Sequence, residues 1–517
     1  MNVTCSRRRF IGLAAGGAAL TACDAWGAAT THGSGKSLSP EPSAAFNPDV
    51  ELELTAAQST AQLLPGAPTR LWQFTGKVLK GDPQALTTLP GSSLPVIRVR
   101  QRQRLRIVFR NELPEESIVH WHGLHLVQKM DGHPMYAIAP GQRYVYEFVV
   151  DNRAGTYWFH PHPHGRTGGQ VYRGLAGLFI VDDDEEARLG LPTGEFELAW
   201  VLQDRRFDAA NQLVYASNRM DMMMGFTGDR ILVNGRPDHV ERVAATAYRV
   251  RLLNASNSRF YKLAWGDGRP LTVIGADGGL LERPIDKPYV MLAPAERVEL
   301  WVDLSREKPG AERVLRSLPF SGGMMGMGPG MGPGMRGSGA LPNGAAFDVL
   351  RVRVDRVGAT ARALPSRLSR MPWPRIEEAA NRNAPRAIRL EMGPGRLTLN
   401  GRTFDMTAVA QDEIVKLGTT EMWEFSNAAG PMSHPVHVHN LQFRVIERLP
   451  GRGLASVYNT MRAGLVDEGW KDVVIVMPGE RVRVLMRFTD HAGLYLYHCH
   501  ILEHEDLGMM RNYRVQP

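Results

Sequence analysis

The sequence predicts an all-β protein made of three related β-sandwich domains. Three observations support this prediction. Short segments alternate apolar and polar residues with period two, one sequence pattern recurs along the chain, and 53 glycines and 34 prolines provide turns between short strands. A chain of 517 residues is also too long to fold around a single ordinary core.

The alternating segments mark the predicted strands. Successive side chains of a strand point to opposite faces, so alternation lets one face pack in a core while the other meets solvent. Extended helical periodicity is scarce, which favours sandwiches of short strands over a mixed fold. Clear examples of alternation lie at residues 95–100, 105–109, 144–148 and 481–485.

An internal repeat divides the chain. Pro-Gly-Gln-Arg at 140–143 is echoed 338 positions later by Pro-Gly-Glu-Arg at 478–481, and the same offset aligns His160 with His498. Pro-Ala-Glu-Arg at 294–297 is a weaker copy without neighbouring histidines. We therefore predict that the first and third domains carry the chemistry, with a first domain at 47–187, a second at 188–357, a linker at 358–387 and a third domain at 388–517.

Residues 1–22 resemble a twin-arginine export signal. A triple arginine precedes an apolar stretch that is about half as long as a membrane-spanning helix requires. Leu-Thr-Ala-Cys at 20–23 resembles a bacterial lipobox, which predicts membrane attachment through a lipid on Cys23; ordinary cleavage nearby is the alternative. Residues 23–46, rich in small residues and proline, suit a flexible tether. We expect a periplasmic or other exported position in the cell envelope.

The charge and the cysteine content limit the classes of function that the sequence allows. The formal net charge is +8, but no run of lysines and arginines is interleaved with aromatic residues, so we expect no nucleic-acid partner. Cys5 and Cys23 lie in the targeting region, which leaves Cys499 as the one cysteine of the mature body and excludes an internal disulfide there. A lone thiol in an exported protein is open to oxidation, so Cys499 is expected to have a chemical role.

Ten of the 16 histidines gather in four clusters. Imidazole is a common ligand of transition metals, and two histidines separated by one residue on a strand point to the same face. A single histidine would more often be a surface or core residue, but four clusters in two related domains point to metal binding. The members are His120, His122, His160, His162, His434, His437, His439, His498, His500 and His504.

The His498-Cys499-His500 segment is the most specific pattern. On one strand the two histidines face one way and the cysteine faces the other, so a single strand can contact two metal sites. His434, His504 and Met509 complete a set of two histidines, one cysteine and one methionine with Cys499, which is the ligand set of a blue-copper electron-transfer site.

The four clusters resemble the multicopper oxidase family, and most closely its bacterial three-domain laccases and cuprous oxidases. The matching motifs are H-W-H-G at 120–123, W-F-H-P-H at 158–162, H-P-V-H-V-H at 434–439 and H-C-H-I-L-E-H-E-D-L-G-M at 498–509. The resemblance covers essentially the whole mature chain. It implies three cupredoxin-like Greek-key β-sandwich domains and four copper ions.

The resemblance also implies a role for each matching residue. The type 1 copper, where electrons enter, is assigned to His434, Cys499, His504 and Met509. The type 2 copper is assigned to His120 and His437, and the type 3 pair to His122, His160, His162, His439, His498 and His500. Glu505 and Asp131 match positions with proton-relay roles, with a salt-bridged or solvated acid as the alternative. His164 continues the spacing but has no ligand role in the family.

The implied activity is one-electron oxidation of phenolic compounds or Cu(I), coupled to four-electron reduction of dioxygen to water. Methionines gather in a Gly/Pro loop at 322–337 and at 220–224, and thioether sulfur suits Cu(I). An incidental linker remains the alternative for the first segment and a partly buried core for the second. A copper-sequestering, copper-tolerance protein with secondary oxidase activity is the alternative function. We expect a monomer.

Overall fold

A computed structural model describes residues 40–321, 341–358, 362–393, 395–428, 430–451 and 455–517. The predicted export signal, the lipobox cysteine, most of the tether and the methionine-rich loop 322–337 lie outside the described residues. Where the chain is described, none of its helices has the length and apolar character needed to cross a bilayer.

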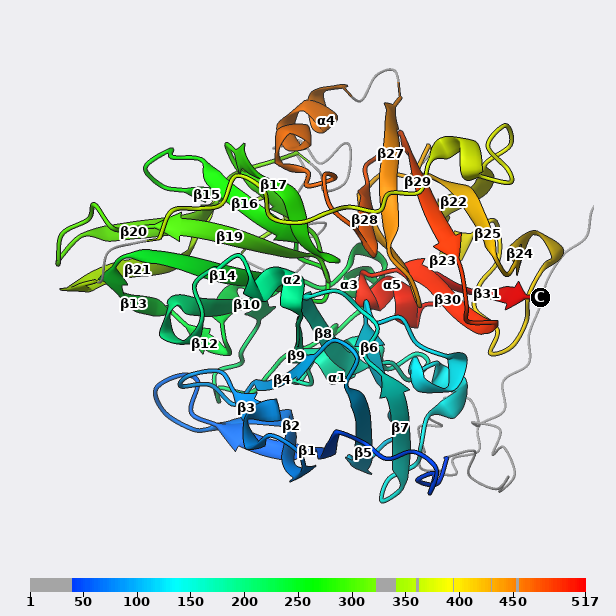
Figure 1. The fold of residues 1–517 in the computed structure, drawn as a ribbon, viewed down its shortest axis with the longest axis horizontal. Coiled ribbons are helices and arrows are strands. Elements are labelled where there is room, and N and C mark those ends of the chain that lie inside the picture. The colour runs from blue at the N-terminus through cyan, green and yellow to red at the C-terminus, as the bar shows by residue number, and fades with distance from the viewer. Residues whose placement is uncertain (1–39, 322–340, 359–361, 394, 429, 452–454) are drawn as a thin grey trace, which may run out of the picture. The chain divides into compact units, whose positions relative to one another are not determined.

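The strands form six sheets that fall into three consecutive pairs along the chain (Figure 1). All four segments chosen for their alternation are strands. This confirms the predicted all-β fold of three sandwiches, while the exact domain boundaries stay a prediction. The first pair joins the sheet β2(Thr69–Lys80)-β1(Val50–Ala61)-β5(Arg104–Glu112)-β7(Arg143–Val149) to the sheet β3(Leu86–Thr88)-β4(Pro95–Arg100)-β9(Gly177–Asp182)-β8(Gly155–Pro161)-β6(Val119–His122).

The second pair of sheets contains a seven-stranded sheet. Its core joins side chains of both sheets, among them Leu252, Leu300 and Leu263. One sheet runs β12(Arg236–Pro237)-β11(Arg230–Val233)-β10(Glu197–Arg205)-β14(Ala247–Asn254)-β19(Arg297–Asp303)-β16(Leu271–Ala276)-β17(Gly279–Lys287), and the other runs β13(Val240–Ala245)-β21(Phe347–Val357)-β20(Glu312–Ser317)-β15(Tyr261–Trp265)-β18(Val290–Leu292).

The third pair carries the C-terminal histidines. Trp423 and Val484 of one sheet pack with Val436 and Tyr497 of the other in a common core. The sheets run β23(Arg396–Leu399)-β22(Arg386–Gly393)-β25(Thr419–Ser426)-β29(Glu480–Phe488)-β27(Phe443–Pro450) and β24(Ile414–Lys416)-β31(Met510–Gln516)-β30(Gly493–Cys499)-β26(His434–Val438)-β28(Val473–Val476). The described α-helices are short: α1(Thr167–Tyr172), α2(Asp184–Ala187), α3(Arg219–Met224), α4(Ala455–Met461) and α5(Leu502–Asp506).

The repeated Pro-x-x-Arg pattern forms the same turn in each pair of sheets. Gly141, Ala295 and Gly479 have φ angles of 78°, 71° and 72°, and the turns lead into β7, β19 and β29. A residue with a side chain is strained in this left-handed conformation, and the other two turns have glycine at this position. The contacts around Ala295 must therefore stabilise it.

The predicted linker 358–387 packs closely against the second pair of sheets where it is described. Leu368 is fully buried, and the Ser369 hydroxyl donates to the carbonyls of Leu280 and Leu281 on β17. Farther on, Ala379 forms a bridge with Thr420 of the third pair. The segment is therefore attached to both pairs of sheets.

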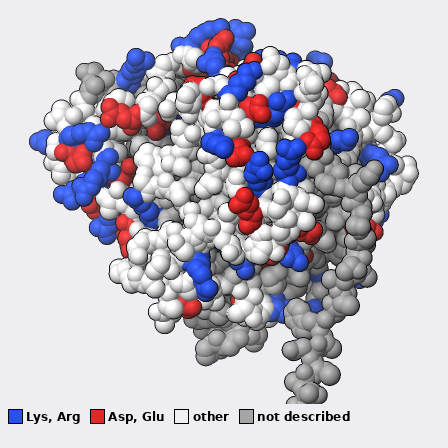
Figure 2. All heavy atoms as spheres, turned by 90° about the horizontal axis from the view of Figure 1, so that it is seen from below, with Lys and Arg blue, Asp and Glu red and all other residues white. Residues whose placement is uncertain are grey.

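Charged side chains are mixed on the face seen in Figure 2. Lysines and arginines alternate with aspartates and glutamates there, and uncharged surface lies between them. Arg110 of β5 forms an ion pair with Glu53 of the neighbouring strand β1. The described lysines and arginines on this face form no continuous stripe of the kind that tracks a phosphate backbone.

Candidate metal centres

Neighbouring strands bring the predicted histidines together. β6 pairs with β8 so that His120 lies opposite His160, and β26 pairs with β30 so that His437 lies opposite His498. All ten clustered histidines are buried. Because these strands belong to the first and third pairs of sheets, the cluster forms where the two pairs meet.

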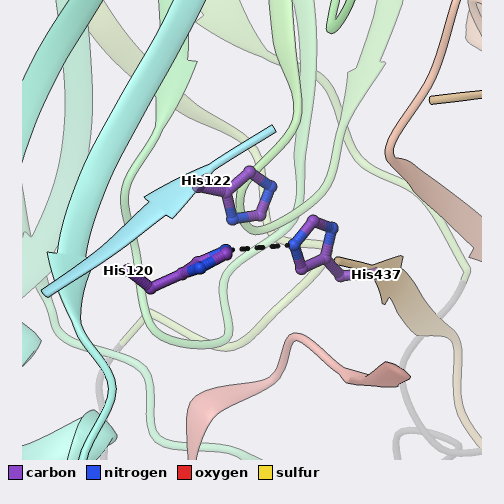
Figure 3. A group of neighbouring side chains, drawn as sticks. All are labelled: His120, His122 and His437. Atoms are coloured by element: carbon purple, nitrogen blue, oxygen red, sulfur yellow. Dashed lines mark hydrogen bonds between the residues drawn. The ribbon is translucent and has the colours of Figure 1, made fainter. Parts of the chain in front are cut away.

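The eight histidines assigned to the last three coppers form overlapping groups. His120 and His122 project from β6 towards His437, and the Nε2 atoms of His120 and His437 are 3.4 Å apart (Figure 3). The ring nitrogens of each group lie within 4.8 Å of one another, and the groups are His120, His122 and His437; His122, His160 and His500; and His162, His439 and His498. The six residues assigned to the type 3 pair thus separate into two sets of three.

The distances between these rings fit bound metal ions. The Nε2 of His498 lies 3.1 Å from the Nε2 of His439 and 3.5 Å from that of His162. Two nitrogens that bind one ion at about 2 Å stand roughly 3 Å apart. Burial lowers the pKa of His160 to about 4 and that of His498 to about 3, so both rings are neutral and offer lone pairs.

The outward-facing nitrogens of most rings are held by hydrogen bonds. The Nδ1 atoms of His120 and His437 donate to the carbonyls of Asp131 (2.6 Å) and Asp472 (2.7 Å), which leaves Nε2 for the cluster. His122 is reversed: its Nε2 donates to the Asp472 carboxylate at 3.1 Å. Its Nδ1 is buried and has no hydrogen-bond partner among the described residues, so this atom faces the metal site.

Cys499 marks a second centre on the other side of β30. Its Sγ lies 3.3 Å from His434 Nδ1 and 3.6 Å from His504 Nδ1. Met509 is fully buried, and its carbonyl accepts from the Cys499 amide at 3.1 Å. Burial raises the pKa of the free Cys499 thiol, and a bound cation would reverse that effect by stabilising the thiolate. The predicted alternation is therefore present: Cys499, the last residue of β30, faces this centre, while His498 before it and His500 just past the strand face the larger cluster.

The short helix α3 covers this second centre. His504 Nε2 donates to the carbonyl of Met223 at 3.1 Å. Met223 and Met224 pack against the core of the third pair of sheets, whereas Met220 is 50% exposed. The methionines at 220–224 thus connect a candidate ligand with the surface.

The two predicted carboxylates both contact the larger cluster. Asp131 Oδ2 accepts from His439 Nδ1 at 2.8 Å. Glu505 lies between His162 and His498, with its oxygens 3.5 Å and 3.3 Å from their Nδ1 atoms. Burial raises the pKa of Asp131 and of Glu505 well above the ordinary carboxyl values, so both groups favour the protonated form.

Histidines outside the four sequence clusters make other contacts. His164 is exposed and its ring packs 4.9 Å from that of Phe404. The rings of His125 and His491 stack on each other with centroids 4.4 Å apart. Sequence reasoning missed Asp472, which contacts two of the clustered histidines. Its signal was weak, because it lies outside every histidine motif.

Buried histidines, a thiol and β-sandwich domains in this arrangement define a copper protein with several metal ions. Profiles described as multicopper oxidase match residues 75–186 and 376–517. Multicopper oxidase mco of Staphylococcus aureus is 30% identical over 424 residues, which cover 81% of each chain. The chain belongs to the multicopper oxidase family, and its metal is therefore copper.

Solved structures agree with this assignment. McoA multicopper oxidase from the hyperthermophile Aquifex aeolicus has a TM-score of 0.76 and 34% identity, over 91% of this chain and 97% of that chain. A laccase from Pediococcus acidilactici has a TM-score of 0.73 and 31% identity, over 93% and 95% of the two chains. Both similarities extend over all three pairs of sheets.

Proposed function

We propose that this protein oxidises phenolic compounds or Cu(I) one electron at a time and reduces dioxygen to water. Four donor electrons and four protons convert one dioxygen to two waters. Each phenol loses an electron and a proton to give a phenoxyl radical, and each Cu(I) gives Cu(II). The observation that carries the proposal is the single strand β30, which joins the Cys499 centre to the histidine cluster.

We assign four coppers to the two centres. The type 1 copper would be held by His434, Cys499, His504 and Met509, the type 2 copper by His120 and His437, and the type 3 pair by His122, His160, His162, His439, His498 and His500. The two sets of three nitrogens described above support two ions in the type 3 pair. When bound, these coppers supply one-electron redox steps and the place where dioxygen is reduced.

The chain provides the routes between the centres. His498 and His500 flank Cys499, so electrons would cross by the covalent bonds of three consecutive residues at the end of β30. Glu505 and Asp131 are suited to supply protons, because burial keeps their carboxyl groups protonated beside the cluster.

The donor would enter at α3. The ring of His504 is linked through the Met223 carbonyl to a helix that bears four methionines, at 220, 222, 223 and 224. Soft thioethers favour Cu(I), and the partly exposed methionine surface can also receive an aromatic ring. Phenols and Cu(I) are therefore both proposed as donors.

We also propose that the protein acts as a monomer outside the cytoplasm. The triple arginine and the apolar stretch after it support twin-arginine export, and Leu-Thr-Ala-Cys at 20–23 supports a lipid on Cys23. Metabolic labelling with a fatty acid, compared between the natural chain and Cys23→Ala, tests the lipid. Equal labelling of the two chains would contradict it.

Oxygen uptake by the copper-loaded protein tests the proposed reaction. With Cu(I) or dimethoxyphenol as donor, one dioxygen should disappear for every four electrons supplied, and no peroxide should accumulate. Binding of Cu(I) without oxygen uptake, in protein shown to contain all its copper, would instead indicate a copper-sequestering protein.

A further inference from the structure

We propose that Arg297 of the second pair of sheets is a positioning residue for the histidine cluster, acting through Asp472. This inference rests on the proposed function. It gives the second pair of sheets, which supplies none of the candidate ligands, a part in orienting the histidine cluster. The juxtaposition that carries it is Arg297, Asp472 and His122, all buried at the place where the three pairs of sheets meet.

Asp472 holds two histidines of the cluster at once. Its carboxylate accepts from His122 Nε2 at 3.1 Å, and its backbone carbonyl accepts from His437 Nδ1 at 2.7 Å. These two bonds determine which nitrogen of each ring faces the metals. The rings also stack on each other with centroids 3.8 Å apart, so a displacement of one disturbs the other. Asp472 therefore orients a proposed type 3 ligand and a proposed type 2 ligand together.

Arg297 fixes the plane of that carboxylate. Its Nη1 and Nη2 donate to Oδ1 and Oδ2 of Asp472 at 2.6 Å and 2.5 Å. A two-point contact between guanidinium and carboxylate leaves the acid little freedom to rotate. Oδ1 also accepts from His122, so the orientation of the arginine is passed on to the histidine ring.

Arg297 is itself held from three sides. Its Nε donates to the Thr156 carbonyl at 3.0 Å, Nη1 also donates to the Ala295 carbonyl at 3.0 Å, and Nη2 donates to the Asp277 carbonyl at 2.9 Å. The Ala295 carbonyl belongs to the left-handed turn of the repeated pattern. The turn that is a Pro-Gly-x-Arg motif in the other two pairs here helps to aim a buried arginine.

The residue before Asp472 is anchored in the same way. Lys471 is buried, and its ammonium lies 2.9 Å from Asp277 and 2.8 Å from Glu296, both of the second pair of sheets. The Asp472 amide also donates to Asp277, at 3.3 Å. The second pair of sheets thus contacts both the backbone and the side chains of the segment that leads into β28.

Gly123 provides the space for this contact. It follows His122 in H-W-H-G and has a φ of 86°. A Cβ at this position would lie 2.5 Å from Asp472 Oδ2 and 2.9 Å from Arg297 Nη2. The glycine of the motif therefore permits the ion pair to approach the histidine strand.

The test is Arg297→Lys, which keeps the buried positive charge but removes the two-point contact of the guanidinium with Asp472. The matched control is Arg249→Lys, because Arg249 is an equally buried arginine on neighbouring β14 that pairs with Glu186 and Glu299 and touches none of the clustered histidines. Each variant is loaded with copper and dialysed against graded chelator. The measurements are copper per chain, the paramagnetic resonance signal of the type 2 copper, and the blue absorption of the Cys499 centre.

Arg297→Lys should lose type 2 and type 3 copper at about 10- to 100-fold lower chelator concentration, with its blue absorption per chain unchanged. Arg249→Lys should retain both the type 2 resonance signal and the blue absorption, even if its melting temperature falls. Unchanged cluster copper in Arg297→Lys, or equal loss in the two variants, would overturn the proposal.

Asp472→Asn is a second variant in case Arg297→Lys fails to fold. It keeps the backbone carbonyl that holds His437 and should show the same selective loss. Retention of both signals in this variant would also overturn the proposal. Absence of all three signals in the natural protein would refute the proposed function instead, so the two failures are distinguishable.

Discussion

Cys499 is the residue at which the two centres meet. Its thiol faces His434 and His504, while the histidines on either side of it face the larger cluster. A thiolate ligand gives a blue-copper site its intense absorption and its low reorganisation energy for electron transfer. A serine hydroxyl provides neither property.

Cys499→Ser should therefore abolish the blue absorption and reduce oxygen uptake by at least about 100-fold. The fold should remain, because serine is close in size and the site lies in a well-packed core. Absorption spectroscopy with circular dichroism checks this prediction. A variant that stayed blue would show that another residue supplies the thiolate-like ligand.

His500→Ala should separate the two centres. His500 belongs to a set of three histidines on the cluster side, and both of its ring nitrogens are buried without hydrogen-bond partners in the described part of the chain. The blue absorption should persist while oxygen uptake is lost. The control is His164→Ala, which alters an exposed histidine of similar spacing. Normal oxygen uptake in His500→Ala, or equal loss in both variants, would contradict the assignment.

At this scale the sequence predicted which residues meet but not how each ring is turned. The His-x-His spacing and strand alternation were sufficient to group the ligands, since they depend on neighbouring residues. The reversed ring of His122 depends on Asp472, which is 350 positions away. Neither spacing nor composition contains that contact, because it is created by packing between pairs of sheets.

The element proposed to receive the donor is α3. Asn218 caps it by accepting from the Asp221 amide, and the Met223 carbonyl touches His504. The sequence predicted the methionine cluster and left open whether it was core or donor site. The structure shows that the cluster lies partly in the core and partly at the surface, since Met224 packs inwards and Met220 is half exposed. The donor role stays a prediction, because burial alone does not test it.

Replacing the four methionines of residues 220–224 with leucine should lower Cu(I) oxidation more than phenol oxidation. Leucine keeps the apolar volume, at a cost usually below about 1.5 kcal/mol each, but removes the soft sulfur. The measurement is the ratio of kcat/KM for the two donors. Met406→Leu, at an exposed methionine outside α3, is the control. An unchanged ratio would show that the methionines of α3 have only a structural role.

The whole molecule is held together by buried charges as well as by apolar cores. Arg249 and Arg251 of the second pair of sheets bind Glu299, and Arg249 also binds Glu186, which follows the first pair. Between the first and third pairs the contact is instead lined by histidines. Bound copper should therefore stabilise that contact in particular.

The copper-free protein should lose stability as the pH falls. Burial lowers the pKa of His160 to about 4 and of His504 to about 4, from an unfolded value near 6.5. The unfolded chain therefore binds more protons between pH 6.5 and 4, and unfolding becomes easier across that window. Buried carboxyl groups with raised pKa values act in the opposite direction, and these are Asp131, Glu296, Asp472, Glu480, Glu503, Glu505 and Asp506. The ten histidines of the two centres all have lowered pKa values and outnumber them.

Thermal unfolding of the copper-free protein between pH 7.5 and 5 measures this effect. The midpoint should fall with pH, and added copper should raise it most at pH 7.5, where protons compete least for the imidazoles. A midpoint that stayed constant over this range would show that the histidines titrate equally in the folded and unfolded states.

The most direct test of two linked centres is an anaerobic reductive titration of the copper-loaded protein. Four electrons per chain should be taken up and the blue absorption should bleach, and admitting dioxygen should restore the colour as all four electrons leave. Uptake of a single electron, or a bleached centre that dioxygen does not reoxidise, would contradict the link that β30 provides between Cys499 and the histidine cluster.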